Sequence, residues 1–314
     1  MACLAGSPDA GRILEHATAI AALSGARLTA IRVMPTEGTP GRRVDPVDWD
    51  IKMHEEYRQL RHLSDETGAP DNMRLAVVGG RAAHCICEEA RNTGVDLTVL
   101  GAGALGTPAG WGLGGTARHV AECFPGSVLI VPAKLDGEMR GKVPARRIVV
   151  PLDGSPHSEG ALRIAVAIAT NRAAELVLLH AVPEIALSTN GPPDPEDEAL
   201  RDQLRRRNER SAKTRLERMR RLIPADKIRS RVRLLSGQEP RRALMRAICE
   251  ENCEMLVLSA RGLGGDPDLP IGSTADYLIS HAVTPVLLVR SAERVSHRSA
   301  GTAPSRSYAV RDHW

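Results

Sequence analysis

Short apolar runs alternate with amphipathic stretches along most of this chain, and many of the runs end in glycine-rich turns. In the second half the apolar runs are Arg147–Leu152, Leu176–Ala181, Val232–Leu235, Met255–Leu258 and Pro285–Val289. Each run has the length of a buried strand. Helical spacing of apolar residues and start signals such as Ser155-Pro156 predict helices between the runs. Strands that alternate with helices predict a parallel α/β sheet with right-handed crossovers.

The same pattern occurs twice. Leu4-Ala5-Gly6-Ser7-Pro8 returns 148 residues later as Leu152-Asp153-Gly154-Ser155-Pro156, and Leu97–Gly103 returns 158 residues later as Met255–Arg261. A repeat of this length is a whole domain rather than a solenoid unit. The strands expected in the first copy are Ala2–Ala5, Leu28–Val33, Arg74–Val78, Leu97–Leu100 and Ser127–Val131.

Four segments follow from this repeat. We expect a first domain at residues 1–132, a linker at 133–145, a second domain at 146–290 and a disordered tail at 291–314. The tail is rich in Ser, Arg and His and has no apolar period, so it cannot bury enough surface to fold.

Composition narrows the class of protein. Aromatic residues make up 2% of the chain, so the core must consist of Ala, Val, Leu and Ile, which favours parallel strands buried on both faces. A net charge of +4 and few aromatics do not favour a nucleic-acid partner. No apolar run is long enough to span a bilayer and no signal peptide is visible, which predicts a cytoplasmic protein without a membrane partner.

Six cysteines also bear on the class. The close pairs Cys85/Cys87 and Cys249/Cys253 have no histidine or further cysteine pair nearby at the spacing of a zinc site. Free, buried or half-buried thiols are therefore expected, and no metal site.

The segment with the clearest chemistry follows the fourth strand of the second copy. It reads Ser259-Ala260-Arg261-Gly262, then nine residues, then Gly272-Ser273-Thr274 at the start of a helix. Glycine lets backbone N–H groups approach a ligand, and a helix start attracts phosphate. Asp153 ends the first strand and would lie at the topological switch point if the first and fourth strands are neighbours. Glycine-rich loops also make plain strand-to-helix turns, which remains the alternative.

These residues resemble the universal stress protein family over about residues 1–290. Its nucleotide-binding members carry G-x₂-G-x₉-G-(S/T) after the fourth strand and an aspartate at the end of the first. The resemblance implies a doubly wound, Rossmann-like five-stranded sheet of order 3-2-1-4-5 in each copy. It implies ATP, AMP or ADP as ligand, with Mg²⁺ as a candidate companion. It also implies pairing through the fifth strands, Val128–Val131 against Val286–Val289, as an intramolecular pseudo-dimer; a homodimer of chains stays open.

The resemblance assigns the ligand to the second copy. Asp153 would hold the nucleoside, the Ala181 backbone would border the adenine, and the glycine loop would hold the phosphates. The implied binding positions are Pro151, Asp153, Ala181, Ser259, Arg261, Gly262, Gly272, Ser273 and Thr274. Ser259 replaces the first glycine of the motif. The first copy has Gly101, Ala104, Gly114 and Gly115 in the loop and Ala5 in place of the aspartate, so we expect it to be nucleotide-free.

Three functions remain under consideration. The first is an adenine-nucleotide-binding regulatory protein of the stress response that acts on an unidentified protein partner. The second is a nucleotide-free interaction module of the same fold. The third is an enzyme of a related nucleotide-binding α/β class, such as an adenylating or pyrophosphate-releasing enzyme, or a slow ATPase. No nucleophile–base pair is apparent, so we expect no catalytic residues. His157 and His180 are interpreted as structural or surface residues, and Asp266 and Asp268 are the nearby acidic candidates for Mg²⁺.

Overall fold

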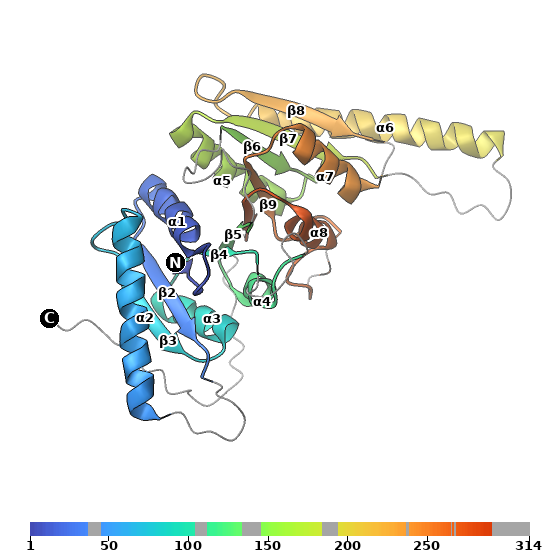
Figure 1. The fold of residues 1–314 in the computed structure, drawn as a ribbon. Coiled ribbons are helices and arrows are strands. Elements are labelled where there is room, and N and C mark those ends of the chain that lie inside the picture. Colours follow the sequence, from blue (N-terminus) through green and yellow to red (C-terminus); the bar gives the residue numbers. More distant parts are fainter. Residues whose placement is uncertain are drawn as a thin grey trace. The chain divides into compact units, whose positions relative to one another are not determined.

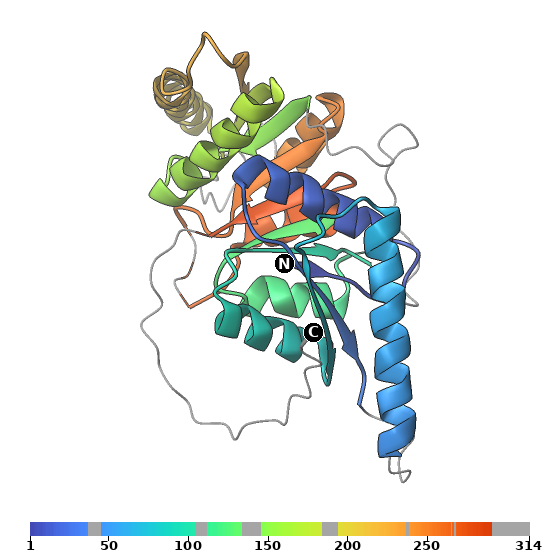
Figure 2. The same cartoon turned by 90° about the vertical axis from the view of Figure 1, so that its left-hand side faces the viewer.

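The computed structural model describes residues 1–36, 45–103, 112–133, 146–183, 194–236, 239–264, 266 and 268–290. Contacts divide the chain into two compact units, Met1–Val143 and Pro144–Arg290 (Figures 1 and 2). The predicted tail at 291–314, Ala104 and nearly all of the predicted linker lie outside the described residues.

The first unit is a parallel sheet with helices on both faces. Its strands are β1 (Ala2–Cys3), β2 (Thr29–Met34), β3 (Arg74–Gly79), β4 (Leu97–Gly101) and β5 (Ser127–Val131). Its helices are α1 (Ala10–Ser24), α2 (Pro46–Glu66), α3 (Ala82–Thr93) and α4 (Gly115–Cys123). The strand order is β3-β2-β1-β4-β5. Figure 2 shows α1 and α2 on one side of this sheet and α3 and α4 on the other.

The second unit repeats this arrangement. Its strands are β6 (Arg147–Pro151), β7 (Glu175–Ala181), β8 (Ser230–Leu235), β9 (Met255–Ser259) and β10 (Val286–Val289). Its helices are α5 (Pro156–Arg172), α6 (Pro195–Arg220), α7 (Pro240–Glu250) and α8 (Ser273–His281). The order β8-β7-β6-β9-β10, all parallel, is the first unit's order again. The predicted fold class, a doubly wound 3-2-1-4-5 sheet in each copy, is confirmed.

The central strands are buried on both faces, as the low aromatic content predicts. Ile148, Val149 and Val150 of β6 have no exposed surface, and neither do Leu256 and Val257 of β9. The helices begin where the sequence signals them. Ser155 accepts a hydrogen bond from the Ser158 amide at 3.1 Å, with proline in the first turn of α5. Because the strands of each unit are parallel, their carboxyl ends lie at one edge of the sheet, and the loops that contain Asp153 and Gly262 begin there.

Helix α6 is much longer than the strand that it covers. Its residues Pro195–Arg220 span about 39 Å at 1.5 Å per residue, whereas β8 spans about 20 Å. Figure 1 shows α6 running beside β8 and reaching past its end. Leu216 and Met219 pack into the core, while Leu200 is 47% exposed. No helix in the described ranges is long and apolar enough to cross a membrane.

One cysteine pair departs from the expectation of free thiols. Cys87 of α3 and Cys123 of α4 form a disulfide, because these helices pack against each other on one face of the first sheet. Local spacing in the sequence does not reveal a pairing between two separate helices. Cys3 and Cys253 are free and buried, and burial raises the pKa of each thiol to about 12.

Candidate functional site

The carboxyl ends of β6 and β9 lie side by side in the second unit. β6 pairs with β7 on one side and β9 on the other, and the crossovers from β6 and β9 run in opposite directions, so the switch point lies between these two strands. Asp153 follows β6, and Ser259 ends β9. The structure therefore brings the predicted aspartate and the predicted glycine loop to one place, where open α/β sheets bind ligands.

Asp153 joins the two loops directly. Its Oδ1 accepts from the Ser155 amide at 2.9 Å, and its Oδ2 accepts from the Leu263 amide at 2.7 Å. Burial by itself would raise the pKa of this carboxyl. Hydrogen bonds from Ser155, Leu263 and Ser158 outweigh burial and hold the pKa below its ordinary value. Asp153 is therefore a carboxylate at neutral pH, and its remaining lone pairs can accept from a further donor such as a sugar hydroxyl.

Gly262 makes this contact sterically feasible. A Cβ built on Gly262 would lie 2.3 Å from Asp153 Oδ2, far inside contact distance. The sequence predicts this glycine as access for a ligand to backbone amides. The structure adds a second reason, because any side chain at position 262 would push the Asp153 carboxylate off the loop.

The loop returns to the strand end before α8 begins. The Gly272 amide donates to the Ala260 carbonyl at 2.8 Å, so this N–H is already used inside the loop. A Cβ on Gly272 would lie 3.6 Å from Ala260 O and 4.0 Å from the Gly262 nitrogen. The next amides belong to Ser273 and Thr274, which are exposed at the first turn of α8, where a helix leaves amides without intrahelical partners. The backbone amides of this loop that could bind an anion therefore lie at the first turn of α8 and at Gly262.

Asp266 and Asp268 are exposed in the loop, and the Asp266 side chain bonds to the local backbone. Asp266 Oδ1 accepts from the Asp268 amide at 2.9 Å, and Leu269 N donates to the Asp266 carbonyl at 3.1 Å. This local turn uses one oxygen of the Asp266 carboxylate. Within the part of the chain that the structure describes, no group of three or more His, Cys, Asp or Glu residues is placed to hold a metal ion.

The side of the candidate site opposite the glycine loop is formed by β6, β7 and α6. Pro151 ends β6 beside Leu179, and Ala181 ends β7. His180, near the end of β7, links these two strand ends, because its Nδ1 is 2.5 Å from the Leu152 carbonyl just after β6. This supports its interpretation as a structural residue.

Sequence reasoning missed Arg215 of α6. Its Nη1 is 3.5 Å from the Asp153 carbonyl, and a Cβ on Gly154 would lie 2.5 Å from its Cδ. Gly154 has φ of +83°, which favours glycine, so the turn beneath Arg215 is compact. Arg215 thus lies across the turn that carries Asp153. It is 62 residues from Asp153 in sequence, so no local pattern could have revealed it.

The first copy keeps the frame of the loop but not its chemistry. Gly114 N donates to the Ala102 carbonyl at 2.8 Å, matching the bond from Gly272. Ala5 supplies no carboxylate, and a Cβ on Gly6 would meet no described atom within 4 Å. Buried Arg32, at the position of His180, is instead paired with Glu56 of α2 at 2.5 Å. The loop-to-loop contact made by Asp153 therefore has no counterpart among the described residues of the first copy.

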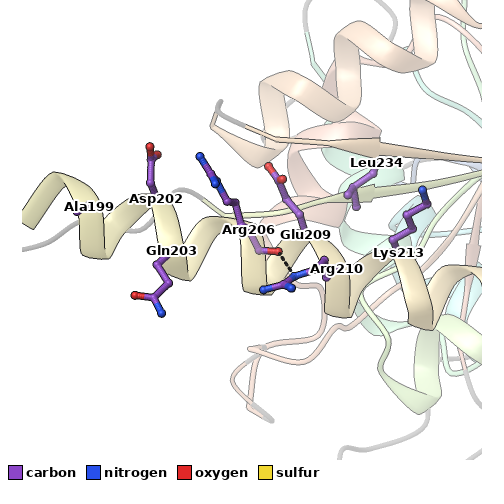
Figure 3. A pocket seen from close by; sticks show the side chains of 8 residues that line it. All are labelled: Ala199, Asp202, Gln203, Arg206, Glu209, Arg210, Lys213 and Leu234. Atoms are coloured by element: carbon purple, nitrogen blue, oxygen red, sulfur yellow. Dashed lines mark hydrogen bonds between the residues drawn. The ribbon is translucent and has the colours of Figure 1, made fainter.

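A separate hollow of about 860 Å³ lies along the outer part of α6 (Figure 3). It is lined by Ala199, Asp202, Gln203, Arg206, Glu209, Arg210, Lys213 and Leu234. Its charges are mixed, and none of the predicted binding residues lines it. The hollow is therefore a surface feature distinct from the candidate site.

Comparison with known proteins assigns both copies to one family. The family whose sequence model matches is the Universal stress protein family, over residues 1–132 and 144–290. A universal stress protein of Thermus aquaticus is 33% identical over 147 residues, which is 46% of this chain and 98% of the relative. A universal stress protein structure from Archaeoglobus fulgidus is 17% identical with a TM-score of 0.63, covering 92% of this chain and 97% of that chain. Another universal stress protein, solved in complex with cAMP, is 26% identical over 42% of this chain and 97% of that chain, with a TM-score of 0.34.

Proposed function

The chain belongs to the universal stress protein family as a tandem member, and we propose that its second copy binds an adenine nucleotide and acts as a regulatory switch. In this proposal Asp153 holds the nucleoside and Ala181 borders the adenine. The phosphates lie against Gly262 and the first turn of α8, with Ser273 and Thr274 as hydroxyl donors. The first copy is proposed to be nucleotide-free.

One observation carries the proposal. Asp153 is ionised, is tied to the Leu263 amide, and depends on a glycine at position 262 for its place. A plain strand-to-helix turn needs no carboxylate drawn across from a neighbouring strand. The arrangement instead holds an acceptor for sugar hydroxyls and a set of phosphate donors at a fixed separation, which lowers the ordering cost of binding.

The donor set suits nucleotide phosphates and offers little chemistry. Backbone amides, two hydroxyls and the Arg261 guanidinium bind anions, but none of them is a general base. In this proposal a magnesium ion would accompany the triphosphate, because no group of three or more His, Cys, Asp or Glu residues in the described part of the chain is placed to hold one. Binding without turnover fits a switch, in which the nucleotide favours one arrangement of the loop and a protein partner recognises it. Pairing of the two copies through β5 and β10 stays a prediction from the sequence.

The ligand can be identified from the protein as purified. Protein expressed with and without Asp153→Ala is heat-denatured, and the released small molecules are analysed by mass spectrometry. We expect an adenine nucleotide from the wild type at close to one per chain and much less from the variant. A wild type that releases no nucleotide and binds none on titration would favour the nucleotide-free interaction module.

A further inference from the structure

A disulfide joins two helices on one face of the first unit. Cys87 lies in the middle of α3, and Cys123 is the last residue of α4, 36 residues later. The two helices pack side by side (Figure 2), so the bond ties the end of α4 to its neighbour. In the first copy α4 is the counterpart of α8, the helix that follows the glycine loop. The bond therefore acts on a helix whose equivalent belongs to the candidate site of the second copy.

The second copy keeps these two helices without the cysteines. At the offset of 158 residues, Met245 of α7 and His281 of α8 stand at the positions of Cys87 and Cys123. Helices α7 and α8 pack against each other as α3 and α4 do. This fold therefore needs no covalent bond between the two helices, and the cysteine pair is an addition made in the first copy alone.

The other cysteines indicate the kind of surroundings in which this bond forms. All six cysteines are among the described residues, and four of them, Cys3, Cys85, Cys249 and Cys253, have no disulfide partner. A chain that folds in an oxidising compartment commonly pairs its cysteines, whereas disulfides in reducing surroundings are mostly transient and redox-sensing. A single disulfide beside four free thiols fits the second case better.

The two halves of the bond differ in access. Cys87 is 2% exposed, whereas Cys123 is half-buried, so a small thiol such as glutathione reaches the bond more readily from the Cys123 side. Its thiolate attacks the Cys123 sulfur, the S–S bond breaks, and Cys87 leaves as a thiolate and takes up a proton. A second glutathione attacks the mixed disulfide and releases the Cys123 thiol together with glutathione disulfide. The two glutathione thiols supply the two electrons, and glutathione disulfide reverses the same steps.

We propose that Cys87 and Cys123 form a reversible redox switch, through which the first copy responds to the thiol–disulfide balance around the protein. In the disulfide form α3 and α4 are joined, and in the dithiol form packing alone holds the end of α4. Cys3 and Cys253 do not compete, because burial raises the pKa of each to about 12 and keeps both as unreactive thiols. The switch does not depend on nucleotide binding by the second copy.

The first measurement counts thiols on the full chain. The protein is equilibrated with glutathione and glutathione disulfide at ratios from roughly 1:1 to 1,000:1, then acid-quenched, denatured and alkylated for mass spectrometry. We expect four alkylated cysteines at the oxidising end and six at the reducing end, with Cys87 and Cys123 as the pair that changes. Cys87→Ser/Cys123→Ser should show four at every ratio. The matched control Cys85→Ser, on the same helix as Cys87, should keep the transition.

The second measurement follows the effect on the fold. The bond closes a loop across 36 residues and so restricts the unfolded chain, and reduction should lower the unfolding midpoint of the wild type by at least about 5 °C. Reduction should leave the midpoint of Cys87→Ser/Cys123→Ser unchanged. Hydrogen exchange should become faster in α3 and α4 of the reduced wild type and stay the same in α7 and α8.

Three results would overturn the switch. A bond that stays intact at every glutathione ratio is a permanent structural cross-link, and a chain with six thiols at every ratio has no switch. A thiol count that changes while the midpoint and the exchange of α3 and α4 do not would leave the bond without an effect on the fold. If Cys87→Ser/Cys123→Ser fails to fold, the oxidised and reduced forms of the wild type still supply the comparison.

Discussion

Replacing Gly262 by alanine tests the contact that holds the candidate site together. The added methyl would lie 2.3 Å from Asp153 Oδ2, so either the carboxylate or the loop must move by more than 1 Å to restore an ordinary contact. The hydrogen bond from the Leu263 amide to Asp153 would then break. A hydrogen bond to a charged group contributes about 1.5–3 kcal/mol, so we expect a loss of about 2 kcal/mol. For a unit of this size, that corresponds to a fall in unfolding midpoint of roughly 4–8 °C.

The assays are thermal unfolding and nucleotide titration, with two controls. Gly264→Ala adds the same methyl two residues away, where a Cβ meets no described atom within 4 Å, and should leave both measurements nearly unchanged. Asp153→Ala removes the oxygen with which the new methyl clashes, so adding Gly262→Ala to that variant should lower its stability little further. We also expect Gly262→Ala to weaken nucleotide binding at least about tenfold. A variant as stable as the wild type with unchanged binding would refute the role given to the Asp153–loop contact.

Three further predictions concern stability and turnover. Burial alone would raise the pKa of Glu175, but hydrogen bonds from Arg147 and Arg231 outweigh it and lower this pKa from 4.5. The stability that ionised Glu175 adds to the folded state is therefore fully present above pH 4.5 and is lost as the pH falls through the lower pKa of the folded state. Urea midpoints of the wild type and Glu175→Gln should therefore differ most above pH 5 and converge below pH 4.5; a constant difference would contradict this. A Cβ on Gly79 would lie 2.6 Å from the Trp49 ring, so Gly79→Ala should destabilise the first unit by about 1–3 kcal/mol, as measured by unfolding monitored through tryptophan fluorescence. Gly115→Ala is the control, because a Cβ there meets no described atom within 4 Å, and it should leave the stability unchanged. ATP turnover should stay below roughly 0.01 per second, far under the usual range of about 1 to 1,000 per second; phosphate release near 1 per second that vanished in Asp266→Ala/Asp268→Ala would make the protein an ATPase.

Much of the sheet follows from the order of apolar runs. Runs such as Leu176–Ala181 and Pro285–Val289 are apolar at nearly every position, which happens only where both faces of a strand are covered. The observed strands β7 and β10 lie within one residue of these runs. The meeting of Asp153 with the glycine loop follows in the same way, because the carboxyl ends of neighbouring parallel strands share one edge.

What could not be predicted depends on tertiary packing. Arg215 reaches the Asp153 turn only because α6 packs across β7 and β8, and a charged helix face gives no sign of which residue will make such a contact. The disulfide between Cys87 and Cys123 likewise requires that α3 and α4 lie side by side. The hydrogen bond from the Gly272 amide to the Ala260 carbonyl was also not predicted, while the contact of Gly272 with a ligand stays a prediction. In each case the deciding partner is remote in sequence.

The central claim is one nucleotide site per chain, in the second copy, and a matched glycine pair tests it most directly. Gly272 and Gly114 precede equivalent helices and donate equivalent hydrogen bonds, so valine at either position replaces a glycine with the same backbone role. Titration with ATP should give about one site in the wild type and in Gly114→Val. Gly272→Val should show no measurable site. Two equal sites in the wild type, or a site lost in Gly114→Val and kept in Gly272→Val, would contradict the assignment.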